Sequence, residues 1–410
     1  MILVLLAGLV LMRESRQEPL ASWDDRWVDF LATTSREAQP EAPFTLVGID
    51  DGALQEHPWP WTPLDFSLFF QAVLPHGPAV LAVDEVLDWD HFALTDAQLK
   101  KLPQYEKILL DHIHRAPRML LGAQLGFPDD PQVPPPWQEV PLLRQVKGDA
   151  SALPEFPIVD RQPSEDYRLA ATIGFTNLPK THARYNSVPL LFRHHGQVVP
   201  SFPLQALMMW ARLTPDEVSV ELGSHIDLGR KRRIPIDARG RMRVDFATPR
   251  GAISFDDMLF AAEQSAAGNR PVVDLSKLKG RIVLLTRVDA KAKKIPLAAS
   301  RLGSPGELFA AAIATMQNQS FIQRAPVWVE LAVLAAVAIL GYFAPKWRRF
   351  GAVAAGFVFL AAYVMIAMAV FNHWLIWLPG ILPAGAVLCF VLFRLVASDT
   401  VPRPKKPVIL

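Results

Sequence analysis

The stretch Phe44-Thr45-Leu46-Val47-Gly48-Ile49, followed at once by Asp50-Asp51, decides the fold class of this chain. It is a short apolar run, and a segment with helical spacing of its apolar residues follows at 64–74. Further apolar runs stand at 79–83 and 119–123. Strand, helix and strand of these lengths form a parallel βαβ unit that is buried on both faces. The sequence therefore predicts a mixed α/β domain with a parallel βαβ start.

Acidic pairs end the first two of these predicted strands: Asp50-Asp51 after one and Asp84-Glu85 after the other. In parallel neighbouring strands both pairs lie at the carboxyl edge of the sheet, where open α/β sheets bind ligands. Four converging carboxylates repel one another unless a hard cation, a basic ligand or protein Arg or Lys side chains neutralise them. We predict a ligand-binding site at this edge. The alternative is that Asp51 and Glu85 cap the following helices or face water.

Two tryptophans, Trp59 and Trp61, follow the first acidic pair within Pro58-Trp59-Pro60-Trp61. A packed loop that braces the next helix is the favoured interpretation of this segment, but aromatic side chains commonly line small-molecule sites, so both tryptophans remain pocket candidates. The predicted ligand-binding set is Asp50, Asp51, Trp59, Trp61, Asp84 and Glu85. No phosphate loop, G-x-S-x-G, H-E-x-x-H or C-x-x-C motif occurs, so the sequence predicts no catalytic residue, no metal ligand and no cofactor.

The region 327–397 is almost continuously apolar, and only a basic cluster at 345–349 and a polar break at 372–374 interrupt it. Its three apolar blocks are each long enough to cross a hydrocarbon core of about 30 Å, so they predict three membrane spans. Glu330 lies one turn inside the first span, where an ionisable group is costly. It either reaches the interface or pairs between helices and couples the outer domain to the spans.

The positive charges orient these spans, because short loops rich in Lys and Arg stay on the cytoplasmic side. Lys346, Arg348 and Arg349 are therefore inside, as is the tail with Arg403. The predicted organisation is an N-terminal helix at 1–12, an extracytoplasmic domain at 13–325, three spans at 326–397 and a cytoplasmic tail at 398–410. Twelve residues reach only about 18 Å, so the first helix is interpreted as shortened at its start, with a cleaved signal peptide as the alternative.

Composition fits a polar body joined to a membrane part, with 51% hydrophobic and 20% charged residues. Lys and Arg number 42 against 40 Asp and Glu, for a net charge of +2, so the chain lacks the basic excess of a nucleic-acid-binding protein. The single cysteine, Cys389, lies in the last predicted span and excludes an intrachain disulfide.

A series of short motifs follows one another along the body in a fixed order. The series is Val47 to Leu54, Pro58 to Trp61, Ala79 to Asp84, Ile173 to Asn177, Ser187 to Leu190, Pro200 to Leu204, Gly240 to Phe246 with Ile253 to Phe255, Leu278 to Leu285, and the helix Pro305 to Arg324. In this order, and ahead of three spans, the chain resembles the CHASE2 family of extracytoplasmic sensor domains. Asp24-Asp25-Arg26-Trp27 fits the helix that precedes that domain, and the proline-dense stretch 126–163 predicts a surface insertion without regular elements.

The resemblance implies a bacterial, multi-pass inner-membrane protein with a periplasmic domain that senses a small ligand or envelope cue. It also implies a homodimer that passes its state to a histidine kinase or nucleotide cyclase. In this chain Thr286 to Lys294 replaces the glycine-rich turn usual after the strand 282–285. Only 398–410 follow the spans, so the signal is expected to reach a separate cytoplasmic kinase or cyclase. A docking protein of the envelope without switching and a metal-dependent enzyme remain the alternatives.

Overall fold

The structure is a computed structural model that describes residues 20–34, 40–92, 94–128, 139–180, 184–229, 232–247, 252–298, 301–343 and 349–396. The chain divides into two compact units. The sensor unit, as it is called below, is Ala38–Phe321, and the helical unit combines Met1–Glu37 with Ile322–Leu410. The helix predicted at 1–12 and the tail predicted at 398–410 lie outside the described residues.

A seven-stranded sheet organises the described part of the sensor unit. Its strands are β14 (Ile253–Ser254), β1 (Phe44–Ile49), β15 (Ile282–Arg287), β2 (Val80–Val83), β3 (Met119–Gly126), β6 (Thr172–Phe175) and β5 (Ile158–Arg161). The first five are neighbours in that order, and β6 and β5 both pair with β3. All pairings are parallel except that of β5 with β3. The predicted mixed α/β domain with parallel strands is confirmed, although β15 separates β1 from β2, which were expected to be neighbours.

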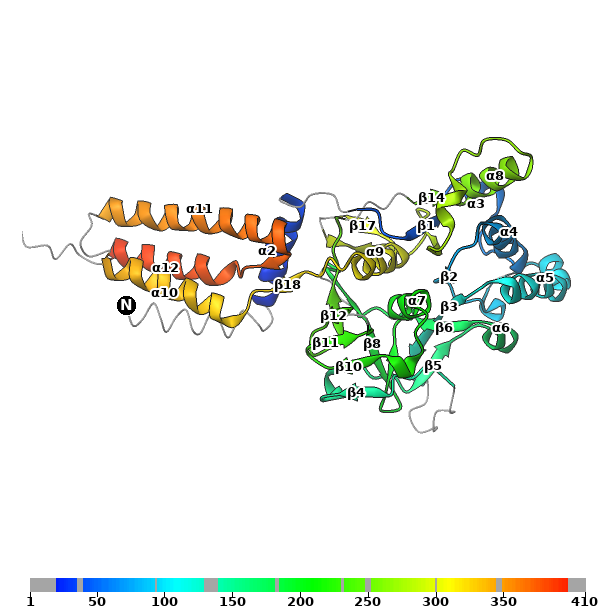
Figure 1. Cartoon of the computed structure of the whole chain (residues 1–410), viewed down its shortest axis with the longest axis horizontal. Helices are drawn as coiled ribbons and strands as arrows, with labels where there is room; N and C mark the ends of the chain where they lie inside the picture. The colour runs from blue at the N-terminus through cyan, green and yellow to red at the C-terminus, as the bar shows by residue number, and fades with distance from the viewer. Residues whose placement is uncertain are drawn as a thin grey trace, which may run out of the picture. The chain divides into compact units, whose positions relative to one another are not determined.

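Helices cover both faces of this sheet (Figure 1). One face carries α4 (Pro63–Val73), α5 (Asp96–Arg115) and α8 (Phe255–Ala266), and the other carries α7 (Phe202–Ala211) and α9 (Pro305–Asn318). Successive side chains of a strand point to opposite faces. In β2, Leu81 and Val83 accordingly join one apolar cluster, whereas Val80 and Ala82 join the other. Burial on both faces explains why these strands read as unbroken apolar runs.

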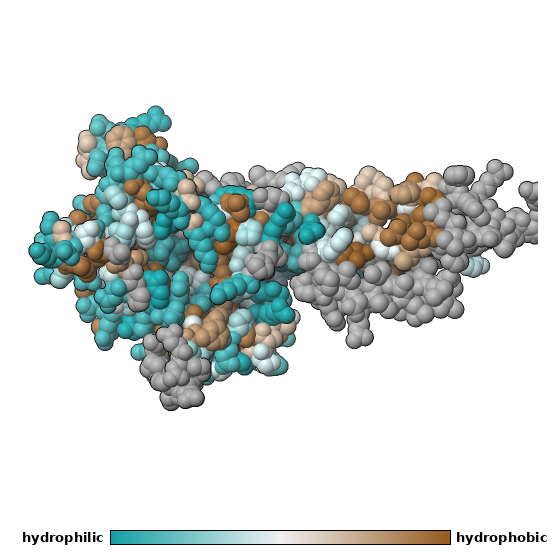
Figure 2. All heavy atoms as spheres, turned by 180° about the vertical axis from the view of Figure 1, so that it is seen from behind, coloured by the Kyte–Doolittle hydropathy of each residue, from teal (hydrophilic) through white to brown (hydrophobic). Residues whose placement is uncertain are grey.

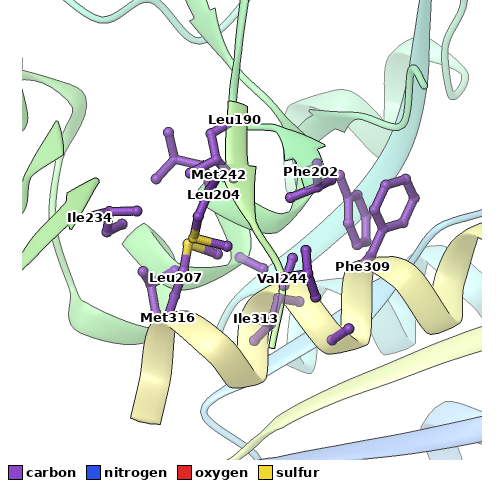
Figure 3. Packing of buried hydrophobic residues seen from close by; sticks show 14 of the residues in the cluster. Leu190, Phe202, Leu204, Leu207, Ile234, Met242, Val244, Phe309, Ile313 and Met316 are labelled. Atoms are coloured by element: carbon purple, nitrogen blue, oxygen red, sulfur yellow. The ribbon is translucent and has the colours of Figure 1, made fainter. Parts of the chain in front are cut away.

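Short strands extend the core beyond α7 and α9, as Figure 3 shows for Leu190, Ile234 and Met242. They are β4 (Gln145–Lys147), β7 (Ser187–Pro189), β8 (Leu191–His194), β9 (Gln197–Pro200), β10 (Ser219–Glu221), β11 (His225–Asp227), β12 (Arg233–Pro235), β13 (Arg241–Arg243), β16 (Ile295–Pro296) and β17 (Leu302–Gly303). Because β4 and β5 fall within 126–163, the expectation that this stretch lacks regular elements is wrong where it is described. Each of these strands has at most four residues, which is too short for a clear period.

Three helices of the sensor unit begin with the same local device, a capping box. Thr62 and Asp65 form it at α4, Thr95 and Gln98 at α5, and Ser304 and Glu307 at α9. Shorter helical segments complete the unit: α3 (Ala53–Glu56), α6 (Glu165–Ala170) and the 3-10 turns Leu74–His76, Trp89–His91, Ala150–Ala152, Pro215–Glu217 and Leu275–Leu278. The boxes satisfy the first free N–H groups of each helix and fix where it starts.

The helical unit contains α2 (Leu20–Thr34), β18 (Gln323–Arg324), α10 (Val327–Phe343), α11 (Arg349–Trp374), β19 (Ile376–Trp377) and α12 (Ile381–Val396). The domain prediction placed α2 in the outer domain that begins at residue 13. Its Val28 and Leu31 instead share an apolar cluster with Tyr363 and Phe371 of α11.

In the described part of the chain one helix, Val353–Trp374, is long and apolar enough to cross a membrane, and Val327–Ile339 is a shorter apolar helix. The three predicted spans are therefore not all confirmed, since α10 has 17 residues and α12 has 16. Many large apolar side chains of this unit are nevertheless exposed (Figure 2). They include Leu331, Ile339, Phe357, Val358, Met365, Ile366, Leu388 and Leu392.

Candidate functional site

The carboxyl ends of β1, β2 and β15 bring several predicted site residues to one edge of the sheet. Asp84 directly follows β2, and Thr286 lies on the neighbouring strand β15. The Thr286 hydroxyl donates a hydrogen bond of 2.7 Å to Asp84 Oδ2. The other carboxyl oxygen, Oδ1, is buried and has no hydrogen-bond partner among the described residues. Asp84 therefore keeps one acceptor atom free inside the protein.

Two glycines make room for Asp84: Gly122 lies against its backbone and Gly306 against its carboxyl group. A Cβ atom at Gly122 of β3 would lie 2.4 Å from the backbone oxygen of Asp84. A Cβ atom at Gly306, in the first turn of α9, would lie 1.9 Å from Thr286 Oγ1 and 2.5 Å from Asp84 Oδ2. Real Cβ atoms are essentially never this close to another heavy atom, so both positions require glycine. The start of α9 thus lies directly against Asp84.

The protonation of the acidic pair follows from this environment. Burial, and after it the negative charge of Glu85, raises the pKa of Asp84 to about 8, although the bond from Thr286 favours the ionised form. Burial also raises the pKa of Glu85, against the positive charges of Arg287 and Arg161. The positive end of the α9 dipole additionally favours an ionised Asp84. The ionisation of Asp84 can therefore change when a hydrogen-bond donor binds to it or when it gains or loses a proton.

An ion pair stands beside the acids on the segment that follows β15. Arg287 donates to both carboxyl oxygens of Asp289, at 2.9 Å and 2.8 Å, and its guanidinium lies 4.2 Å from the ring centroid of Trp59. Burial opposes ionisation of Asp289, but the bonds and the charge of Arg287 outweigh it, and the pKa of Asp289 is lowered. Trp59 thus lies at the edge, where it stacks on a protein cation.

Asp50 and Asp51 are held by backbone groups. Asp50 Oδ1 accepts from the Ala53 N–H at 3.0 Å, in the first turn of α3. The exposed Asp51 accepts from the Ala290 N–H at 3.1 Å and 3.2 Å. Asp50 therefore binds the first N–H group of α3, and Asp51 ties β1 to the segment after β15. Helix capping or exposure to water was the predicted alternative for Asp51, and Asp51 is exposed.

Trp61 lies beneath the edge instead of on it. It is fully buried, its indole N–H donates to the His57 carbonyl oxygen at 2.8 Å, and its ring is 4.6 Å from that of Phe255. This environment matches the packed-loop alternative for Trp61. Direct contact between Trp61 and a ligand would require the core to open.

Four residues of this edge were not predicted: Thr286, Arg287, Asp289 and Gly306. The first three belong to the segment that departs from the usual glycine-rich turn, and polar residues directly after an apolar strand were the available signal. Among the described residues, no group of three or more His, Cys, Asp or Glu side chains is arranged to hold a metal ion. The described side chains at this edge can therefore bind a ligand through hydrogen bonds and charge.

A groove of about 910 Å³ lies between α4 and α8. Its lining is acidic and apolar, and the residues that carry this character are Glu56, Leu68, Asp256, Asp257, Phe260 and Glu263. Burial and the nearby charges of Glu56 and Asp50 raise the pKa of Asp256. The groove is therefore acidic, as the sheet edge is.

In the helical unit, Glu330 is fully buried near the start of α10. It accepts a 2.9 Å bond from Arg324 Nε of β18, and Arg324 lies 3.8 Å from Asp24 of α2. Asp24 Oδ1 in turn accepts from the N–H groups of Gly380 and Ile381 at the start of α12, at 3.3 Å and 3.4 Å. Glu330 therefore belongs to a polar cluster that joins α2, β18, α10 and α12.

Comparison with known proteins identifies one relationship. The family model of the CHASE2 domain matches residues 2–343, which is most of the chain. No curated protein and no solved structure matches the chain significantly.

Proposed function

This chain belongs to the CHASE2 domain family of extracellular sensor domains, and from this premise we propose that it is a membrane-anchored receptor module. Its input site is the edge around Asp84, and its output element is α9. The family is sensory and not a known catalytic one. The observation that carries the proposal is the contact of the Asp84 carboxyl group and the Thr286 hydroxyl with Gly306, in the first turn of α9.

The proposed cue is a small ligand that donates a hydrogen bond or brings positive charge to the edge. Asp84 Oδ1 is an acceptor without a partner among the described residues, and Asp51 and Glu85 add negative charge nearby. Such a ligand stabilises the ionised form of Asp84, whereas burial stabilises the neutral form. The two states differ in charge directly beneath α9, and a ligand that prefers one of them shifts the equilibrium.

Helix α9 can carry this change to both chain connections of the sensor unit. Nearly all of its residues are buried in close packing, so a shift at its first turn is expected to reach its C-terminal end. Near its C-terminal end, Gln317 donates to the Pro43 carbonyl oxygen at 3.1 Å and Asn318 donates to that of Pro40 at 2.9 Å. The segment that enters the unit and the helix that leaves it are thus bonded to each other.

The same two connections meet again inside the helical unit. Asp24 of α2 and Arg324 of β18 approach to 3.8 Å, and Glu330 binds Arg324. We assign Glu330 the coupling role: through Arg324 it links the segment after α9 to α10. A displacement of either connection changes the geometry of this cluster and with it the packing of α10 and α12.

The helical unit is proposed to anchor the protein in a bacterial inner membrane. Exposed apolar side chains on α10, α11 and α12 support this, as does the length of Val353–Trp374. In the proposed topology the sensor unit is periplasmic, and the chain crosses the membrane several times and ends in the cytoplasm. The protein acts as a homodimer, and a cytoplasmic kinase or cyclase receives its signal. Reporter fusions at the C-terminus and after Ala325 test this: only the C-terminal fusion should be active in the cytoplasm.

Hydrogen exchange of the full chain in lipid nanodiscs tests the input and output steps without knowledge of the ligand. Asp84→Asn fixes the site in a neutral state of nearly the same shape. We expect altered exchange in α9 and in peptides that cover 40–43 and 320–326, relative to the wild type.

Asp51→Asn is the matched control, since Asp51 lies at the same edge but binds the segment after β15. It should leave the exchange of α9 unchanged. If Asp84→Asn altered exchange only in β2 and β15, the edge would not communicate with α9, and a docking protein without switching would become the better account.

A further inference from the structure

Helix α2 exposes one stripe of large side chains. Trp23 is 60% and Phe30 is 44% exposed, and Arg26 and Thr33 are also exposed. The spacing of three, four and three residues places these four on one helix face. Trp27 stacks on Phe30 with ring centroids 5.5 Å apart, so the aromatic surface is continuous.

The face of α2 opposite this stripe is buried and carries Asp24, and Asp29, which flanks the stripe, is buried as well. Asp24 is 2% and Asp29 is 7% exposed. Asp24 belongs to the cluster with Arg324 and the start of α12, while Val28 and Leu31 fill the apolar part of the same interface. In water, large aromatic side chains are expected on the covered face of a helix, yet Trp23 and Phe30 of α2 are exposed. The outer face is therefore suited to a surrounding that is less polar than water.

Within the helical unit, α2 runs across the ends of the other helices (Figure 1). It meets the start of α12 through Gly380 and Ile381, and its Trp27 indole N–H donates to the Leu378 carbonyl oxygen at 2.8 Å. A helix that lies across the ends of membrane-spanning helices is parallel to the bilayer plane, at the depth of the headgroups.

We propose that α2 is an interfacial helix whose stripe of Trp23, Arg26, Phe30 and Thr33 binds the lipid bilayer. Trp and Phe favour the boundary between headgroups and acyl chains, and the Arg26 guanidinium complements anionic phosphate. The inference rests on the proposed membrane anchor and adds a second, lateral attachment directly before the chain enters the sensor unit. The polar cluster with Arg324 then lies at the same depth, so lipid contact and domain coupling share one helix.

Nitroxide labels on the full chain in vesicles of phosphatidylethanolamine and phosphatidylglycerol test the proposal. In a Cys389→Ala background, labels are placed by Trp23→Cys, Phe30→Cys and Thr33→Cys, and their collisions with oxygen and with a water-soluble nickel chelate are measured. Phe357→Cys, on the exposed face of α11, is the lipid reference, and Leu169→Cys, on exposed α6, is the water reference. We expect oxygen-to-nickel collision ratios at 23 and 30 that are several-fold above the ratio at 169.

The references separate two kinds of failure. If position 357 behaves as lipid-exposed while 23, 30 and 33 behave like 169, α2 does not bind the bilayer, and the membrane anchor stands. If position 357 also behaves like 169, the membrane anchor itself is wrong. Thr33→Cys removes no aromatic side chain, so it keeps the test decisive should the two aromatic replacements impair folding.

Discussion

Thr286 and Asp84 are joined by a hydrogen bond of 2.7 Å, although 202 positions separate them in the sequence. The bond links β15 to β2 at the point where Gly306 of α9 rests on both side chains. The neutral Thr286 hydroxyl can donate to the Asp84 carboxyl group whether that group is ionised or protonated. The pH dependence of folding should therefore report the state of this pair.

Asp84→Asn is expected to change how stability depends on pH. The pKa of Asp84 is raised from 3.8 to about 8, so the folded protein retains a proton that the unfolded chain has lost between these values. Its stabilising contribution is fully present below pH 3.8 and is lost as pH rises through about 8. At about pH 9 the Asn variant, which cannot ionise, should exceed the wild type in stability by several kcal/mol, because one pKa unit corresponds to about 1.4 kcal/mol.

Thermal unfolding of the full chain in nanodiscs across this pH range measures the effect. Asp51→Asn serves as the control and should keep the wild-type profile. Parallel pH profiles for wild type and Asp84→Asn would show that Asp84 is ionised in the folded protein throughout.

Gly306→Ala should destabilise the sensor unit by about 1 to 3 kcal/mol, because the added methyl group overpacks a closed contact. It would collide first with Thr286 Oγ1. Thr286→Ala removes that oxygen, so the double variant should cost less than the sum of the two single variants. Gly52→Ala is a suitable control, since the nearest atom to its Cβ lies 3.3 Å away and its φ is −64°. Strict additivity of the two variants would contradict the contact.

Arg287→Lys tests whether the geometry of the cation matters as well as its charge. Lys cannot donate to both oxygens of Asp289 from one plane or stack on Trp59 in the same way, so we expect a loss of about 1 to 2 kcal/mol. Asp289 is fully buried and would be left with an imperfect partner. Unfolding at neutral pH measures the loss, and a Lys variant as stable as the wild type would argue that charge alone holds this segment.

The sequence predicted the parts of this fold that local pattern determines. β1, β2 and β3 are apolar runs because both of their faces are buried, and the acids that follow β1 and β2 do lie at the carboxyl edge. The position of β15 between β1 and β2 was beyond local pattern, because strand order is decided by packing between distant segments. For the same reason Thr286 and Gly306 could not be connected to Asp84 in advance.

The tryptophans and α2 show a second limit of the sequence. Trp59 and Trp61 are two positions apart, yet one stacks on Arg287 at the edge and the other is fully buried. In α2, the sequence predicted a helix around Asp24 to Trp27 but did not predict that Asp24 and Asp29 would be buried. The spacing of apolar and polar residues indicates that a helix is amphipathic, whereas its packing partner decides which face is covered.

The pair formed by Arg324 and Glu330 offers the most direct test of coupling in the helical unit. Glu330→Gln should destabilise this unit by about 3 kcal/mol, because it leaves the cation of a buried pair without its full counter-charge. Arg324→Gln should cost more than the loss of this bond alone, since Arg324 also approaches Asp24 and lies 5.0 Å from the ring centroid of Trp377. In a double-mutant cycle of thermal unfolding in nanodiscs, we expect a coupling energy on the order of 1 to 3 kcal/mol. If coupling transmits the signal, Glu330→Gln should also abolish any change in exchange at the start of α10 that Asp84→Asn produces, while leaving the changes in α9 and at 320–326 intact. A response of α10 that survives Glu330→Gln would remove Glu330 from the path and leave the other connection, through Pro40 and α2, to carry it.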